Sequence, residues 1–176
     1  MRLVEGVVDV DDVDAFVAAL DDVASETGTS VQAFDARYVV SRRHLERAVE
    51  LADRAIDRGE AIARDRAVEI LLYAAGRRQI TDALELGAST GPNRVIVLVD
   101  ARADGGAEAG DADDAETAAV EAVRSRVLDA VEPTLGDSDP DRVRSYFDVD
   151  DAELAVVDGD VEALVCERVA LLVVER

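Results

Sequence analysis

The chain has 176 residues, with 40 Asp and Glu residues against 19 basic residues, and all 19 are arginine. The absence of lysine excludes a P-loop, an enzyme that forms a lysine Schiff base and a lysine general base. The apolar content of 49% predicts a folded chain in spite of the net charge of −21, and the length suits one domain with a sizeable core.

Apolar periodicity predicts the first elements of the chain. Residues 2–10 mix Val with charged residues in the pattern of a strand, and Asp12 to Glu26 has a helical spacing that ends at Gly28. Ser30 to Phe34 alternates apolar and polar side chains, which predicts a second strand continuing towards residues 38–40.

Two capped helices follow. Ser41 begins a helix that reaches Arg58, and Gly59 stands just past its end. Asp65 begins a second helix that is interrupted at Gly76. The inner face of the first helix is expected to carry Leu45, Ala48, Val49, Ala52 and Ile56.

The remaining chain predicts a mixture of helices, one strand and one loop. A continuous apolar run at 95–99 is typical of a strand buried on both faces, and the Ala-, Gly- and Asp-rich residues 101–114 predict a mobile acidic loop. Helices are expected at 78–86 before Gly87, at 115–131, at 139–147 and at 160–174, where the last residues could also be a strand. These elements predict a single compact α/β domain over 1–176, with a small mixed sheet packed with several helices.

The acidity of the chain indicates its solvent rather than its function. An excess of Asp over Glu and a missing Lys suit a protein kept soluble in near-saturating salt, where the Debye length of about 3 Å at 1 M weakens repulsion between carboxylates. An acidic protein of an ordinary cytosol and one that binds basic partners are the alternatives. With no long apolar run, no signal segment and a single cysteine, we expect a cytoplasmic protein that contacts no membrane.

Few side chains offer catalytic chemistry. His44 has neither a carboxylate and nucleophile for base catalysis nor companions for a metal site, so it is expected to be a surface or capping residue. Cys166 stands at helical spacing among apolar residues and is expected in the core. Acidic clusters such as 9–12 and 111–114 could hold Mg²⁺, but in so acidic a chain they arise from composition alone. We therefore expect no catalytic residue, metal or cofactor.

The arginines are distributed unevenly along the chain. Residues 37–94 hold 11 arginines against 9 acidic residues, a net charge of +2, while the rest of the chain carries −23. Pairs such as Arg42 with Glu46, four residues apart, explain part of this as salt bridges on a helix. Arg77 and Arg78, however, have no acidic neighbour before Asp82, which favours an anion-binding site.

The conformational freedom of Gly76 suits such a site. This glycine can end one helix in a left-handed conformation while Arg77, Arg78 and Gln79 begin the next, so that backbone N–H groups, guanidinium groups and an amide converge. Tyr73 nearby could stack on a base, although packing in the core is its alternative role.

The string ILLYAAGRRQI at 70–80, followed by ALELG at 83–87, resembles a family signature. It is similar to the small accessory subunit of the KEOPS complex, the family that includes the PRPK-binding protein of eukaryotes, here of an archaeal halophilic type. The segments SRRHL at 41–45, AVELA at 48–52 and ERVALL at 167–172 fit the same family.

The resemblance implies a non-catalytic subunit with no cofactor and no small-molecule substrate. The family's complex installs threonylcarbamoyl on the adenosine next to the anticodon of tRNAs, using a catalytic subunit and a small kinase-like ATPase. Archaeal members bind that ATPase and also the 3′ CCA tail of tRNA. Carried over to this chain, the implied tRNA-binding residues are Arg42, Arg43, His44, Tyr73, Gly76, Arg77, Arg78, Gln79 and Ile80.

Two further assignments complete the expectations. The apolar C-terminal segment, with Val165, Val169, Leu171 and Leu172, is expected to contact the ATPase subunit. The alternative function is a small enzyme or nucleotide-binding domain that uses a cluster of Arg77, Arg78 and His44 on a phosphorylated metabolite. The third hypothesis is an interaction module in which the arginines only make salt bridges.

Overall fold

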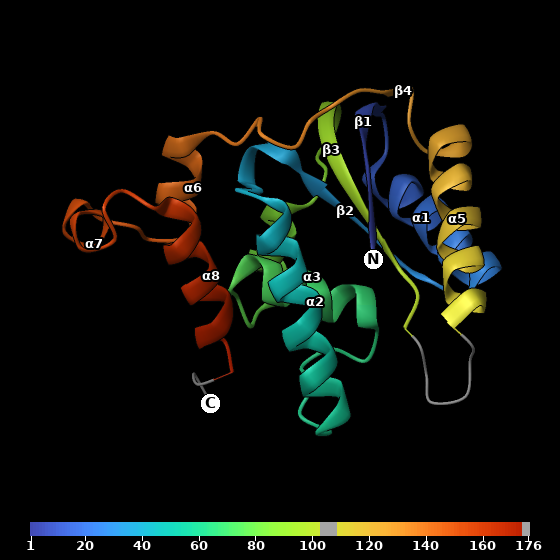
Figure 1. Ribbon diagram of the computed structural model, residues 1–176. Coiled ribbons are helices and arrows are strands. Elements are labelled where there is room, and N and C mark those ends of the chain that lie inside the picture. The colour runs from blue at the N-terminus through green and yellow to red at the C-terminus, as the bar shows by residue number, and fades with distance from the viewer. Residues whose placement is uncertain (103–108, 174–176) are drawn as a thin grey trace. The chain divides into compact units, whose positions relative to one another are not determined.

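The computed structural model describes residues 1–102 and 109–173 (Figure 1). The chain forms two compact units, the first made of residues 1–35 and 88–134 and the second of residues 36–87 and 135–176. Eight α-helices and one four-stranded sheet among the described residues confirm the α/β class. None of the helices in these ranges is both long and apolar enough to cross a bilayer.

The first unit is a sheet with two helices. The strand order is β2-β3-β1-β4, and every neighbouring pair is antiparallel, where a mixed sheet was expected. Helices α1 and α5 contact each other as well as the sheet, on the same side of it (Figure 1). The elements of this unit are β1 (Arg2–Val10), α1 (Val13–Thr27), β2 (Ser30–Asp35), β3 (Gly91–Asp100), α5 (Ala109–Arg126) and β4 (Ala130–Val131).

Local sequence explains most of these boundaries. The Asp12 carboxylate accepts hydrogen bonds from the first turn of α1, and Gly28 ends that helix with a φ of 69°. The run Val95–Val99 is fully buried, as its continuous apolar pattern predicts. Gly6 on β1 faces the β4 backbone so closely that a Cβ atom would lie 2.4 Å from the carbonyl oxygen of Ala130. The sheet can therefore accept β4 only because residue 6 has no side chain.

The acidic loop and the helix after it were predicted with wrong boundaries. Helix α5 begins at Ala109 rather than at 115, so residues 109–114 are helical, and an acidic residue in its first turn, Asp111, suits the positive end of the helix dipole. The helix ends at Arg126 instead of 131, because the chain turns there into β4. Residues 103–108 of the expected loop lie outside the described residues.

The second unit is helical. Helices α2 and α3 form an antiparallel hairpin, and α8 packs against both (Figure 1). The strand predicted to continue towards 38–40 ends at Asp35, where a short 3₁₀ turn begins. The helix predicted at 78–86 is only a short α-helix followed by a 3₁₀ turn. The α-helices are α2 (Arg42–Asp57), α3 (Arg66–Ala75), α4 (Ile80–Ala83), α6 (Pro140–Tyr146), α7 (Asp151–Val156) and α8 (Val161–Leu171), and the 3₁₀ turns are η1 (Ala36–Tyr38) and η2 (Leu84–Leu86).

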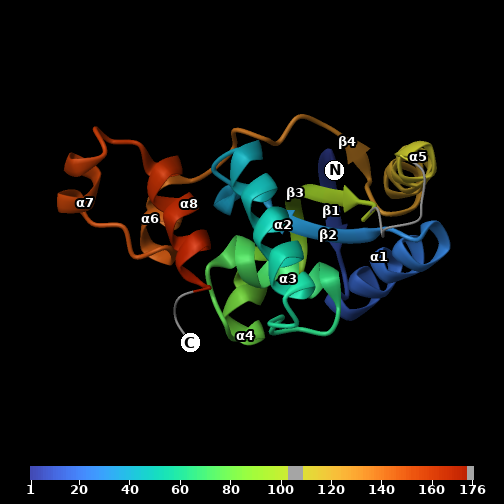
Figure 2. The ribbon, with the colours of Figure 1, turned by 60° about the horizontal axis from the view of Figure 1, so that its bottom comes forward.

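Buried polar contacts hold the α2–α3 hairpin together. At one end, His44 Nε2 lies 2.8 Å from the carbonyl oxygen of Ala74. At the other end, the Arg66 guanidinium donates two hydrogen bonds, of 2.7 and 2.9 Å, to the Asp53 carboxylate. These two contacts place the beginning of α2 beside the end of α3, so residues 58–65 and the turn at Gly76 lie at opposite ends of α3 (Figure 2).

Candidate nucleic-acid interface

The turn after α3 has the conformation that the sequence predicts. Asp65 caps the start of the helix, and Gly76 ends it with a φ of 59°, in the left-handed region that favours glycine. The N–H of Gly76 donates to the carbonyl of Tyr73 at 3.0 Å, and that of Arg77 donates to Leu72 at 3.1 Å. The N–H groups of Gly76 and Arg77 are thus used within the turn and are not offered to an anion.

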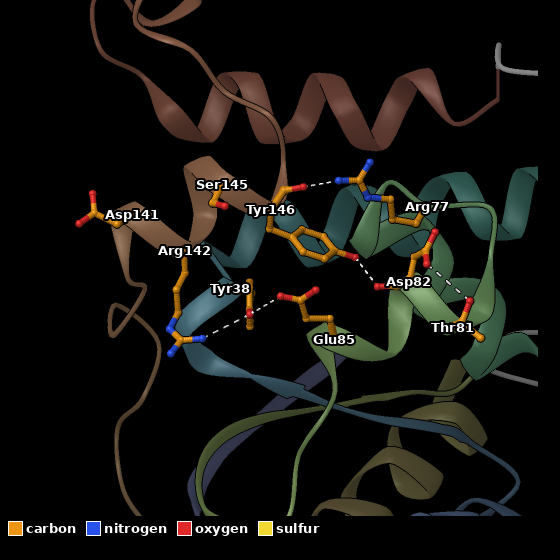
Figure 3. A pocket seen from close by; sticks show the side chains of 9 residues that line it. All are labelled: Tyr38, Arg77, Thr81, Asp82, Glu85, Asp141, Arg142, Ser145 and Tyr146. Carbon is orange, nitrogen blue, oxygen red and sulfur yellow. Dashed lines mark hydrogen bonds between the residues drawn. The ribbon is translucent and has the colours of Figure 1, made fainter.

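Arg77 is half-buried, and its guanidinium is engaged by groups of the protein itself. Its Nη2 atom donates to the carbonyl oxygen of Tyr146, at the end of α6, and lies 3.3 Å from the Asp148 carboxylate (Figure 3). Its guanidinium carbon also lies 5.1 Å from the centre of the Tyr146 ring. Arg77 therefore stabilises the C-terminal end of α6 and keeps the 76–78 turn in place.

Arg78 has the opposite environment, although it is the next residue. Its side chain is exposed, and its one polar contact is a long one, 3.4 Å from Nη1 to the carbonyl oxygen of Leu172. It forms no ion pair with any residue that the structure describes. Gln79 and Ile80 beside it are exposed too, Ile80 by 47%, and the Gln79 amide makes no capping hydrogen bond. These three consecutive side chains form what we call the Arg78 surface.

His44 and Tyr73 are both buried. The expectation that His44 is a surface or capping residue is therefore wrong. The imidazole is fully buried, and burial lowers its pKa from the ordinary 6.5 to about 4, so the ring is neutral at pH 7. Its Nε2 donates to Ala74, which fixes the tautomer and leaves Nδ1 as a buried acceptor that no described residue reaches. The Tyr73 side chain is only 3% exposed, so neither ring is available for stacking on a base.

The two arginines at the start of α2 differ from each other. Arg42 donates a 2.8 Å hydrogen bond to Glu46 four residues later, which neutralises its charge locally. Arg43 is 75% exposed, and its distance to Glu162 is 3.7 Å, so its charge remains largely open to solvent. Of the two, Arg43 is the better anion contact.

A cavity of about 710 Å³ is lined by Arg77, Tyr38 and Tyr146 together with residues around them (Figure 3). The Tyr38 hydroxyl donates to Glu85 at 2.8 Å, and the Tyr146 hydroxyl donates to the carbonyl oxygen of Asp82 at 2.9 Å. Burial raises the pKa of Tyr146 to about 12, against the opposing effect of Arg77. Three carboxylates, from Asp82, Glu85 and Asp141, line this cavity against two arginines, Arg77 and Arg142. The acidic groups outnumber the basic ones, so the cavity is less suited to a phosphate than the exposed Arg78.

The segment expected to contact the ATPase subunit is mostly buried. Val165, Val169 and Leu172 are 0%, 0% and 1% exposed and belong to the core of the second unit. Leu171 is the exception, at 38%. Nearby on α8, Cys166 is half-buried rather than in the core as expected, and burial raises the pKa of its thiol.

The phosphometabolite alternative loses its basis in this geometry. The cluster of His44, Arg77 and Arg78 is not formed, because the first is enclosed between helices and the second is bound to α6. Within residues 1–102 and 109–173, no group of three His, Cys, Asp or Glu side chains could hold a metal ion.

Two further arginines, which the sequence did not single out, share the exposure and the lack of an ion pair seen at Arg78 among the described residues. Arg58 and Arg64 are exposed and form no ion pair in the part of the chain that the structure covers. The sequence signal was weak, because Glu60 stands between them and suggests a partner for either.

Comparison with protein families assigns the chain. The model of the family described as kinase binding protein CGI-121 matches residues 8–172. The chain belongs to the CGI-121 family. The match runs through both compact units and confirms the resemblance drawn from the 70–80 string. A search of curated protein sequences gives no match. CGI-121 proteins bind a kinase, so an accessory, kinase-binding subunit fits this chain better than an enzyme.

Proposed function

We propose that this CGI-121 protein is the non-catalytic subunit of a KEOPS complex that modifies tRNA to threonylcarbamoyladenosine. In this role it binds the kinase-like ATPase subunit, and through it the catalytic subunit, and it recruits tRNA by the 3′ CCA tail in a salt-rich cytoplasm. The observation that carries the tRNA part is Arg78, an exposed arginine with no acidic partner among the described residues, beside the exposed Gln79 and Ile80.

The Arg78 surface offers three kinds of contact to a single strand. A guanidinium binds a phosphate through two parallel hydrogen bonds, an amide reads the edge of a base, and an apolar side chain packs on a base or ribose. Phosphate contacts weaken with salt, by about 0.7 log units of affinity per phosphate for each log unit of salt on single strands. In concentrated KCl we therefore expect Gln79 and Ile80 to contribute to the affinity alongside Arg78.

Filter binding at high KCl tests this recruitment. Intact tRNA should bind more tightly than the same tRNA without its 3′ CCA, and Arg78→Glu should remove that difference. Arg124→Glu is the matched control, because it makes the same charge change on the exposed face of α5, where Arg124 pairs with Glu121. Equal binding of the two tRNAs by the unaltered protein would contradict tail recognition.

For the ATPase contact, we propose the end of α8 with Leu171. The buried neighbours Val165, Val169 and Leu172 hold α8 against the second unit, so their part is to position this turn. Leu171→Glu should prevent co-purification of the ATPase subunit, while Leu135→Glu should not, although Leu135 is exposed to a similar extent, 36% against 38%. Retention of the ATPase by both variants would place the contact elsewhere.

A further inference from the structure

The loop between α2 and α3 holds two exposed arginines together with Glu60 and Asp65, so its net charge is zero. Arg58 and Arg64 stand at its two ends, both exposed and both without an ion pair among the described residues. Along α2, by contrast, Arg47 and Arg54 lie 2.7 and 2.6 Å from the two carboxylate oxygens of Glu50. In a chain with 40 acidic residues, two exposed arginines on one short loop that stay outside the ion pairs of the described residues point to an anionic partner.

The backbone of this loop is held in a defined place. Glu69, on α3, is fully buried, and its carboxylate accepts hydrogen bonds from the N–H groups of Ile62, at 3.0 and 3.1 Å, and of Ala63, at 2.7 Å. At the start of the loop, Gly59 has a φ of 68°, and its N–H donates to Ile56 at 3.0 Å. Arg64 directly follows the anchored residues, so its backbone is fixed before any partner arrives.

The position of the loop relative to the Arg78 surface suggests the partner. The two lie at opposite ends of α3, which has ten residues and is about 15 Å long (Figure 2). Four stacked nucleotides at about 3.4 Å each cover a similar length. The unpaired 3′ end of a tRNA could thus start at one site and reach the base-paired acceptor stem near the other.

We infer that Arg58 and Arg64 bind backbone phosphates of the acceptor stem of a tRNA whose 3′ tail lies at the Arg78 surface. This inference rests on the proposed tRNA recruitment and adds a second site to it. The contact is with phosphates, so it positions the stem and carries no sequence preference. It distinguishes a tRNA from a free single strand that ends in CCA.

The test compares two ligands and two double variants of the full chain. The ligands are intact tRNA and a short single-stranded oligonucleotide that ends in CCA. Arg58→Ala/Arg64→Ala is compared with Arg124→Ala/Arg126→Ala, which makes the same charge change on α5, where both arginines are ion-paired. Affinities are measured over a series of KCl concentrations.

The loop variant should bind tRNA several-fold more weakly, and its plot of log affinity against log salt should be less steep by about 1.8, the value for two duplex phosphates. Its affinity for the oligonucleotide should not change. An unchanged affinity for tRNA would overturn the inference, as would an equal loss for both ligands, which would place the loop in the tail site. Loss of kinase binding alone would also overturn it and assign the loop to a protein partner. If the unaltered protein binds neither ligand, the proposed tRNA recruitment itself fails.

Discussion

The middle and the ends of the α2–α3 hairpin both contain arginines, but these arginines differ in whether an acidic side chain pairs with them. In the middle of α2, Arg47 and Arg54 share Glu50. Arg42, the first residue of α2, is paired as well, with Glu46. At the ends, Arg58, Arg64 and Arg78 have no acidic partner within the described residues. The exposed arginines that stay outside the ion pairs of the described residues therefore lie at the two ends of the hairpin, and counting arginines overestimates the basic surface.

The largest expected effect concerns the buried anchor of one end. Glu69→Ala would leave the half-buried N–H groups of Ile62 and Ala63 without their acceptor and open a space in the core, which should lower the free energy of unfolding by about 3 kcal/mol. Denaturant unfolding in concentrated KCl measures this. Glu69→Gln is the control, because its amide oxygen keeps part of the hydrogen bonding. A loss below about 1 kcal/mol for Ala would show that the loop is not held by this carboxylate.

A comparable effect is expected from pH at the other end, through His44. Its folded pKa of about 4 lies below the ordinary 6.5, so between these values the unfolded chain binds a proton that the folded chain does not. The stabilisation is complete above pH 6.5 and is lost as the pH falls towards 4, by on the order of 3 kcal/mol. The difference in unfolding free energy between the unaltered protein and His44→Gln should change with pH over this window. A constant difference would mean that His44 does not titrate this way.

A smaller effect is expected at the turn that presents Arg78. Gly76→Ala forces a side chain into a φ of 59°, which should lower the unfolding free energy by about 1–2 kcal/mol. The new Cβ would lie 3.4 Å from the nearest atom, the Arg168 carbonyl oxygen, so backbone strain rather than collision is the cause. Gly28→Ala, which also has a positive φ but nothing within 4 Å, is the matched control for the stability change. Only Gly76→Ala should also weaken binding of the CCA tail.

The smallest effect tests the middle of the hairpin. Arg47→Ala removes one exposed ion pair on α2 and should cost about 0.3–0.5 kcal/mol of stability. Because Glu50 already compensates its charge, the variant should bind tRNA as well as the unaltered protein. If instead it weakens tRNA binding as much as Arg78→Ala, ion pairing does not decide which arginines bind, and the distinction between middle and ends would be wrong.

Sequence patterns predicted the elements that local contacts define. Helix α2 begins after Ser41, whose hydroxyl accepts from the N–H of His44, and ends one residue before the expected Arg58. The buried face, however, includes His44, Leu51 and Ala55 in place of Val49 and Ile56. His44 stands four residues before Ala48, so the same spacing that predicted the helix could have shown that the imidazole is buried.

Other features depend on contacts that sequence patterns do not reveal. Arg77 and Arg78 look alike in the string at 70–80, and only the approach of α6, some 70 residues later, separates their environments. Strand β4 has two residues and forms only because it pairs with β1. Helix α7 was missed although its signal is local, a capping box between Asp150 and Glu153.

The length of α3 has a consequence for how the two ends act together. About 15 Å is several times the Debye length of about 3 Å at 1 M salt, so a charge at Arg64 has almost no influence on one at Arg78. In concentrated salt their contributions to affinity should add without coupling in a double-mutant cycle. Each end of the hairpin can then change during evolution without any compensating change at the other.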